Sequence, residues 1–160
     1  MANHLFLIGI NKYKFQDHLL SCVKDVTDFK DVLLEKYEFS ESNIYDLIDE
    51  RATSIRIQDA FRKYSKTLSD SDNLIVYFSG HGEYESQYDK GYWVPYEGSN
   101  YTEYLSNESL IELLDGIECN HLVLISDTCF SNNLLNVGKF KKTSEYLEKK
   151  SRWALTSAFY

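Results

Sequence analysis

The sequence has little of what marks disordered, secreted or membrane-spanning chains. Its 160 residues include one proline and seven glycines, too few for a flexible or low-complexity chain. The three cysteines, Cys22, Cys119 and Cys129, are too scattered for a disulfide framework, and they show no zinc-binding spacing. The first apolar run, 5–10, is shorter than a signal-peptide core and far below the ~20 residues of a membrane helix. We therefore expect a protein of a reducing compartment, located in the cytoplasm and without a membrane partner.

Positive charge is also scarce. The chain has 25 Asp and Glu against 17 Lys and Arg, which gives a net charge of −8. The densest basic stretch, at 139–142 and 149–152, is interpreted as a solvated loop or helix face rather than a phosphate-binding surface. The balance argues against a nucleic-acid partner and suits basic peptides, although net charge alone does not define a substrate.

The apolar residues that are present, 43% of the chain, are enough for the core of one domain spanning 1–160. Continuous apolar runs at 5–10, 74–78 and 122–125 indicate strands buried on both faces of a parallel sheet. The half-polar run 44–48 suits an edge strand, and 153–157 is a fifth candidate. Helical spacing at 21–37, 54–68 and 110–114 alternates with these runs and predicts an α/β sandwich. Residues 91–96 are expected to form a short strand outside the main sheet, because Pro95 disfavours a central one.

Two of the predicted strands end in reactive side chains. His81 follows the strand at 74–78, and Cys129 follows the strand at 122–125. Because parallel strands present their carboxyl ends at one edge of a sheet, neighbouring strands would bring the two side chains together. An imidazole beside a thiol can generate the thiolate nucleophile. The N–H groups of Gly82 and Cys129 could then form an oxyanion hole.

Simpler interpretations exist for each residue alone. A cysteine at a strand end is commonly a small buried side chain, and a histidine between glycines is commonly a turn residue. Their joint occurrence at matching strand ends favours a catalytic role for the pair. A cysteine phosphatase would need arginine six positions after the nucleophile, where this chain has Leu135. The first strand is followed by no glycine-rich phosphate loop.

The motifs around these residues resemble those of the caspases, metacaspases and bacterial caspase-like peptidases. Residues 77–82 read Tyr-Phe-Ser-Gly-His-Gly, and 126–131 read Ser-Asp-Thr-Cys-Phe-Ser, with the cysteine 48 positions after the histidine. The resemblance covers nearly the whole chain. It implies a caspase-like three-layer sandwich with a mostly parallel central sheet. It also implies peptide cleavage through an acyl-enzyme, without a metal or other cofactor in the chemical step.

The same resemblance implies a substrate pocket. Metacaspase-like members carry Asp two residues before the nucleophile, here Asp127, and a Cys-x-x-Asp motif, here Cys22 to Asp25; Ser79 matches a third pocket position. Two carboxylates in one pocket would bind Arg or Lys and repel Asp. Cleavage after basic residues is therefore expected. From the residues alone, an ordinary surface helix residue is the favoured interpretation of Asp25, and a strand-end cap is as good an interpretation of Asp127 as a pocket residue.

The chain also departs from the family pattern. Asn132 stands where the family usually has glycine three residues after the nucleophile, and the aspartate cluster of calcium-dependent members is missing, so calcium activation is not supported. We expect the chain to be the p20-like portion plus the start of the p10-like portion, without the carboxy-terminal strand. A small-subunit portion and a sensor or activator protein are the expected partners. The alternative function is a catalytically silent caspase-like module used for binding or assembly.

Overall fold

The computed structural model describes residues 1–129 and 151–157, in which strands and helices alternate as predicted. In chain order the elements are β1 (Asn3–Gly9), α1 (Cys22–Lys36), the 3-10 turn η1 (Glu41–Asn43), β2 (Ile44–Ile48), η2 (Asp49–Arg51), α2 (Ser54–Thr67), β3 (Asn73–Ser79), β4 (Gly82–Glu85), β5 (Lys90–Trp93), β6 (Leu105–Ser106), α3 (Asn107–Asp115), β7 (His121–Asp127) and β8 (Ser151–Thr156). Most predicted elements are present with ends shifted by one to three residues; α3 extends furthest beyond its prediction.

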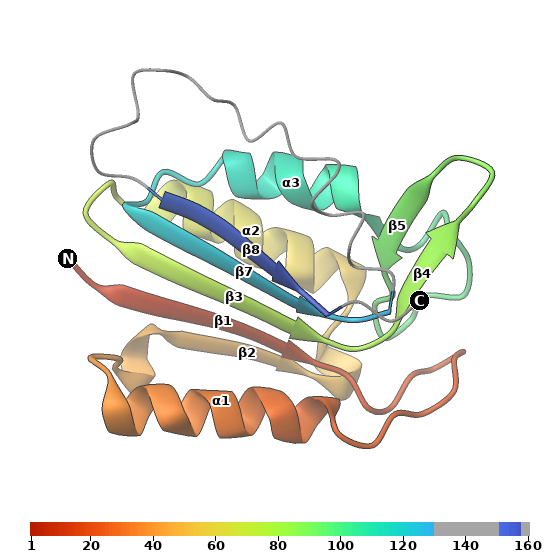
Figure 1. Ribbon diagram of the computed structural model, residues 1–160, viewed down its shortest axis with the longest axis horizontal. Helices are drawn as coiled ribbons and strands as arrows, with labels where there is room; N and C mark the ends of the chain where they lie inside the picture. The colour runs from red at the N-terminus through yellow and green to blue at the C-terminus, as the bar shows by residue number, and fades with distance from the viewer. Residues whose placement is uncertain (130–150, 158–160) are drawn as a thin grey trace.

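The central sheet has five strands in the order β2-β1-β3-β7-β8, and every neighbouring pair is parallel (Figure 1). The half-polar strand β2 lies at one edge, as its pattern predicts. The strand at the other edge, β8, is the fifth candidate. The predicted α/β class with a mostly parallel sheet is confirmed.

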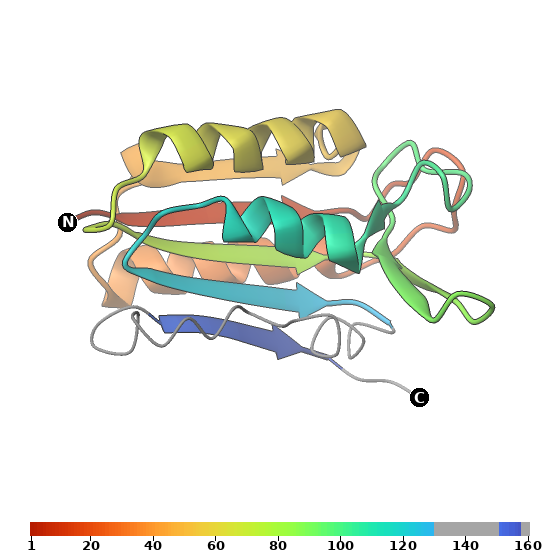
Figure 2. The same ribbon diagram turned by 90° about the horizontal axis from the view of Figure 1, so that it is seen from above.

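Helices cover the sheet on both faces, with α1 on one side and α2 and α3 on the other (Figures 1 and 2). Alternate side chains of a strand point to opposite faces, so each apolar strand supplies both layers. On β1, Phe6 and Ile8 belong to the core beneath α2 and α3, which includes Phe61. Leu5 and Leu7 instead join the smaller core beneath α1. The three-layer prediction is thereby confirmed.

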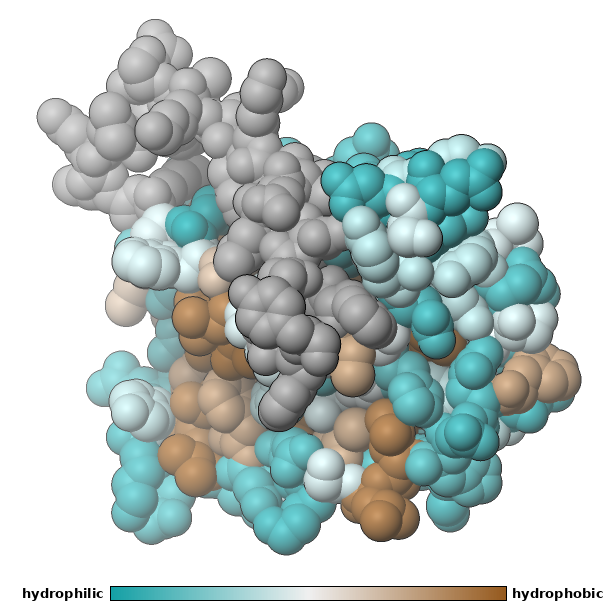
Figure 3. Space-filling view, turned by 45° about the vertical axis from the view of Figure 1, so that its right-hand side comes forward, coloured by the Kyte–Doolittle hydropathy of each residue, from teal (hydrophilic) through white to brown (hydrophobic). Residues whose placement is uncertain are grey.

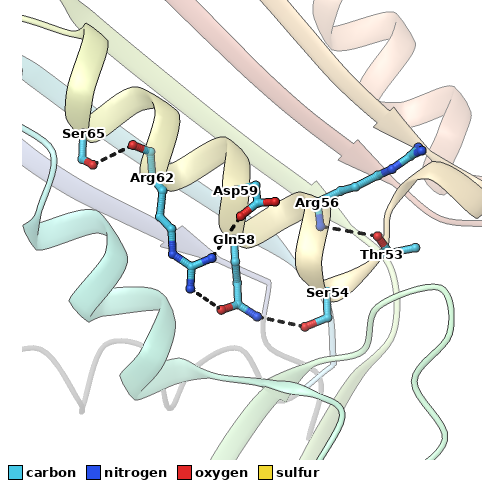
Figure 4. A network of polar contacts seen from close by, with 7 residues as sticks. All are labelled: Thr53, Ser54, Arg56, Gln58, Asp59, Arg62 and Ser65. Carbon is cyan, nitrogen blue, oxygen red and sulfur yellow. Dashed lines mark hydrogen bonds and ion pairs between the residues drawn. The ribbon is translucent and has the colours of Figure 1, made fainter.

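Polar side chains on the outer face of α2 are joined by hydrogen bonds and an ion pair (Figure 4). At its start, Thr53 Oγ1 accepts a hydrogen bond from the backbone N–H of Arg56, which caps the helix. Further along, Arg62 donates to Asp59 and Gln58. These i, i+3 and i, i+4 contacts keep polar side chains on the solvent side while the apolar face is buried.

One face of the sheet is less covered than its sequence predicts. The run at 122–125 indicated burial on both faces, yet β7 alternates: Leu122 and Leu124 are buried towards α3, whereas Val123 and Ile125 are only half-buried on the α1 side. The space-filling view shows patches of hydrophobic surface, coloured brown, on the face that it draws (Figure 3). Since α1 packs mainly on β1 and β3, the expectation of two buried faces holds for β7 on one side only.

A second, antiparallel sheet of three strands, β4-β5-β6, lies outside the main one, as expected for residues 91–96. Trp93 joins the two sheets. Its indole is stacked on Phe78 at 4.2 Å, and its Nε1–H donates a 2.8 Å hydrogen bond to Ser126 Oγ. Both hydrogen-bonded side chains are buried, so this bond fixes the small sheet to the carboxyl ends of β3 and β7. No helix among residues 1–129 and 151–157 is long and apolar enough to cross a membrane.

Ser126→Ala is expected to lower the free energy of unfolding by about 1–3 kcal/mol, because the buried indole N–H of Trp93 loses its partner. Urea denaturation followed by tryptophan fluorescence measures this. Ser42→Ala, at an exposed hydroxyl, is the matched control and should change stability little. Equal stability of the two variants would contradict this role of Ser126.

Candidate active site

The two predicted catalytic residues follow neighbouring strands at one edge of the sheet. Ser79, the last residue of β3, pairs directly with Asp127, the last residue of β7. One step further, the backbone N–H of Gly80 donates to the carbonyl oxygen of Asp127 at 3.4 Å. The chain then continues into His81 on one strand and towards Cys129 on the other. The predicted adjacency of the two strand ends is therefore present.

Beyond the strand ends, Gly82 brings the two segments into contact. Gly82 is buried and opens β4 opposite Trp93. A Cβ at this position would overlap Thr128 Oγ1 and the carbonyl oxygen of Cys129. Only glycine lets the backbone beside His81 lie this close to the backbone at Cys129, so the requirement at position 82 is steric.

Tyr13, in the segment after β1, holds the backbone and ring of His81. Its hydroxyl accepts a 2.7 Å hydrogen bond from the His81 N–H, and the two rings lie 4.8 Å apart. Burial raises the pKa of Tyr13 far above its usual value, so its phenol stays neutral. A side chain at Gly80 would come within 2.5 Å of the same hydroxyl, which explains the glycine there.

The imidazole of His81 is oriented by a backbone carbonyl. His81 Nε2 lies 2.8 Å from the carbonyl oxygen of Asp17. Because a carbonyl only accepts hydrogen bonds, Nε2 carries the proton, and in the neutral ring Nδ1 has the free electron pair. The segment bearing Asp17 is itself fixed, since Asp49 Oδ1 accepts hydrogen bonds from the N–H groups of Asn11 and Lys12 at 2.8 and 2.9 Å.

Two cysteines near this edge differ in environment. Cys129 is exposed, whereas Cys22, at the start of α1, is buried. Burial, reinforced by the charges of Asp25 and Asp127, raises the pKa of the Cys22 thiol. A buried thiol with a raised pKa is a poor nucleophile. Of the two, Cys129 has the accessibility that a nucleophile needs.

An acidic cavity of about 440 Å³ lies between α1 and the ends of β3 and β7. It is lined by Asp25, Asp28, Phe29, Val32, Tyr77 and Asp127. The cavity brings together the two aspartates named from the sequence. A positively charged side chain with an aliphatic stem suits such a lining, because it offers carboxylates together with apolar walls.

Ser79, the third predicted pocket residue, has a different environment. It is buried, its hydroxyl lies near enough to the Cys22 thiol to oppose the rise in the pKa of that thiol, and it is absent from the described residues that line the cavity. Sequence reasoning missed Asp28, Phe29, Val32 and Tyr77. The first three follow Asp25 at i+3, i+4 and i+7 on α1, and Tyr77 shares a face of β3 with Ser79, so residue spacing alone could have identified them.

A larger cavity, about 620 Å³, lies elsewhere, against α2 and residues 97–105. It contains none of the predicted site residues, so its greater size does not make it the reactive site. In the part of the chain that the structure describes, no group of three or more His, Cys, Asp or Glu side chains could hold a metal ion. Asn132, the expected departure after the nucleophile, lies outside the described residues.

Comparisons with known proteins agree with this arrangement. The caspase domain model of the C14 peptidases matches residues 3–157. Metacaspase-6 of Arabidopsis thaliana is 32% identical over 162 residues, covering 94% of this chain and 43% of the relative. Metacaspase-4 of the same plant is 30% identical over 153 residues, covering 87% and 36%. A crystal structure of a Geobacter sulfurreducens protein superposes with a TM-score of 0.67 at 21% identity, covering 81% of this chain and 51% of that one.

The fold and the family match define a caspase-like cysteine peptidase domain. The chain belongs to the caspase domain family, and it is similar to metacaspases. It spans less than half the length of these curated relatives. The Geobacter structure supports the fold alone.

Gly82→Ala is expected to lower the free energy of unfolding by about 1–3 kcal/mol, because the added methyl overlaps backbone as well as side-chain atoms. It should also change the rate at which iodoacetamide alkylates Cys129, since the displaced backbone carries that thiol. Urea denaturation and mass spectrometry measure the two effects. Gly116→Ala is the control, because its Cβ would meet no atom closer than 3.5 Å. A fully stable Gly82→Ala variant would show that the close approach is absent in solution.

Proposed function

We propose that this chain is the catalytic portion of a cysteine endopeptidase that cleaves peptide bonds after Arg or Lys, with Cys129 as nucleophile and His81 as general base. Its family membership supports a peptidase acting on proteins. The proposal of cleavage after Arg or Lys by Cys129 and His81 rests on one observation, the acidic cavity beside the strand ends that bear these two residues. The chain spans under half of its curated relatives, so the activity is proposed for the complete polypeptide.

In the proposed mechanism, His81 Nδ1 takes the proton of the Cys129 thiol. The Nε2–H of the ring stays hydrogen-bonded to the carbonyl oxygen of Asp17. This bond orients the imidazole and stabilises the imidazolium. The thiolate attacks the carbonyl carbon of the scissile bond, and a negative charge develops on the carbonyl oxygen. The N–H groups of Gly82 and Cys129 are the proposed donors to that oxygen.

The tetrahedral intermediate collapses as the C–N bond breaks, and the leaving amine takes the proton from His81. The product is a thioester on Cys129. A water molecule then gives a proton to His81 and attacks the thioester, which releases the carboxylic acid and restores the thiol. Every proton in this cycle moves through the imidazole, and no metal takes part.

Specificity is proposed to come from Asp25 and Asp127. Both line the cavity, and a cationic side chain placed there gains charge-assisted hydrogen bonds. An aspartate side chain would be repelled by the same carboxylates. Ser79 is proposed to support this wall indirectly, because its buried hydroxyl lies near the Cys22 thiol and does not line the cavity.

The expected setting of this activity follows from the sequence. We propose the cytoplasm as the location, supported by three cysteines that are all free. The proposed partners are protein substrates with a basic residue at the cleavage site, a small-subunit portion, and a sensor or activator protein.

Cys129→Ala is expected to abolish hydrolysis of fluorogenic peptides ending in Arg or Lys by the complete polypeptide, because no other exposed thiol is present at the described strand ends. Cys119→Ala, at a buried thiol, is the control and should retain activity. An arginyl ketone probe should label Cys129, as mass spectrometry would show. Absence of labelling together with absence of turnover would favour the silent binding module instead.

Asp25→Asn is expected to lower kcat/KM for peptides ending in Arg by about 10- to 100-fold, because the variant loses a charged hydrogen bond in the cavity. Asp31→Asn, an exposed position on the same helix that does not line the cavity, should leave kcat/KM unchanged. A panel of peptides ending in Arg, Lys or Asp measures both. Preferential hydrolysis after Asp would refute the assignment of the pocket.

A further inference from the structure

The loop between β1 and α1 orients the imidazole of His81 through the carbonyl oxygen of Asp17, which lies 2.8 Å from Nε2. This loop is anchored by backbone hydrogen bonds at two points: the N–H of Lys14 donates to a carbonyl at 3.0 Å, and the N–H of Leu19 donates to another at 2.8 Å. Between these anchors, residues 15–18 form no backbone–backbone hydrogen bond in the part of the chain that the structure describes. The position of the Asp17 carbonyl therefore depends on side-chain contacts.

The side chain of Gln16 supplies such a contact. Gln16 is half-buried, whereas its neighbours on both sides are exposed. Its Nε2 donates a 2.9 Å hydrogen bond to the phenol oxygen of Tyr104 and a second, at 3.4 Å, to the carbonyl oxygen of Gly98. Because a carbonyl only accepts hydrogen bonds, the contact with Gly98 requires the amide nitrogen on this side. Gln16 thus holds the peptide unit next to the Asp17 carbonyl.

Tyr104, the acceptor of the shorter bond, is held in place by other aromatic rings. It lies just before β6, and its ring packs against Tyr92 at 6.2 Å and Tyr101 at 5.6 Å. It also packs against the core beneath α2 and α3. Tyr92 belongs to β5, the strand that Trp93 fixes to the carboxyl ends of β3 and β7. The phenol oxygen therefore has a set position relative to the strand end that bears His81.

We propose that Gln16 is a positioning residue that acts with Tyr104 on the Asp17 carbonyl. Held in this place, the carbonyl keeps the proton of His81 on Nε2 and leaves Nδ1 free to take the proton of Cys129. A displaced carbonyl would let the imidazole turn or carry its proton on Nδ1, and in that form Nδ1 cannot act as the base. This inference rests on the proposed function and extends it to a residue that touches neither substrate nor nucleophile.

The test measures kcat and KM of the complete polypeptide with a peptide ending in Arg. Gln16→Met keeps the length of the side chain and removes its donor, and we expect kcat to fall about tenfold because the general base is displaced. Tyr104→Phe removes only the acceptor, so kcat should fall less, about threefold, since the bond to Gly98 remains. KM should not change in either variant, because neither residue lines the acidic cavity.

A double variant and two controls make the result specific. Gln16→Met combined with Tyr104→Phe should be no slower than Gln16→Met, because Tyr104 acts only through Gln16. Gln58→Met removes a comparable amide, whose Nε2 donates a 3.2 Å bond to a hydroxyl on α2. Tyr92→Phe removes the 2.8 Å bond of a phenol to Glu85 in the small sheet. Both controls should leave kcat unchanged, and an unchanged kcat in folded Gln16→Met would overturn the inference.

A second measurement follows the ring of His81 and needs no substrate. Nitrogen NMR of the complete polypeptide, enriched in labelled histidine and held at a pH where the rings are neutral, distinguishes a protonated Nε2 from a protonated Nδ1. The His81 signals are those lost in His81→Gln. We expect only the Nε2–H form in the wild type and a mixture of both forms in Gln16→Met. A contribution to stability alone would leave the tautomer unchanged, so a lower kcat with an unchanged tautomer would overturn the inference.

Tyr104→Phe decides the question if Gln16→Met does not fold, because its ring keeps the contacts with Tyr92 and Tyr101. In that case an unchanged kcat together with an unchanged tautomer would overturn the inference. Wild-type protein that cleaves after neither Arg nor Lys would overturn the proposed function, whereas the tautomer of His81 would still decide the role of Gln16.

Discussion

The close approach of two backbones at the edge of the sheet is the constraint on which the site depends. Parallel pairing brings Ser79 beside Asp127. The absence of a side chain at Gly82 lets the backbone that follows His81 lie against Cys129. Trp93 then holds the small sheet against the same strand ends through Ser126. The imidazole and the exposed thiol take their places from this contact, and the acidic cavity takes its place from the pairing of β3 with β7 beside α1. A bulkier residue at position 82 would therefore displace the imidazole and the thiol together.

Much of this arrangement could be predicted because it follows from strand order and polarity. Continuous apolar runs at 74–78 and 122–125 indicate buried strands, and if the two strands are neighbours, the residues after them emerge at a common edge. The family resemblance added Asp25 and Asp127, which the structure places in one cavity. The half-polar pattern of β2 likewise indicated its place at the sheet edge.

The remainder depended on contacts between segments that no local pattern records. Tyr13 and Asp17 lie in an irregular segment after β1, and only the folded chain shows that they contact His81. Asp17 acts through its backbone carbonyl, which any residue carries, so its side chain offers no signal. Ser79 was expected in the pocket because of its motif; its side chain is buried near the Cys22 thiol, and its contact with a substrate stays a prediction. Partial exposure of β7 escaped prediction because an apolar run does not reveal how far one helix extends over a sheet.

All the reactive groups lie at the carboxyl ends of the strands, and the chain begins at the opposite edge. Met1 is 88% exposed, and β1 runs seven residues, or roughly 20 Å, from near that end to the carboxyl edge of the sheet (Figure 1). That distance separates the amino end of β1 from the edge that bears His81 and Cys129 by the full length of a strand. A fluorophore or affinity handle attached to a side chain at the amino ends of the strands would therefore lie a strand's length away from His81 and Cys129.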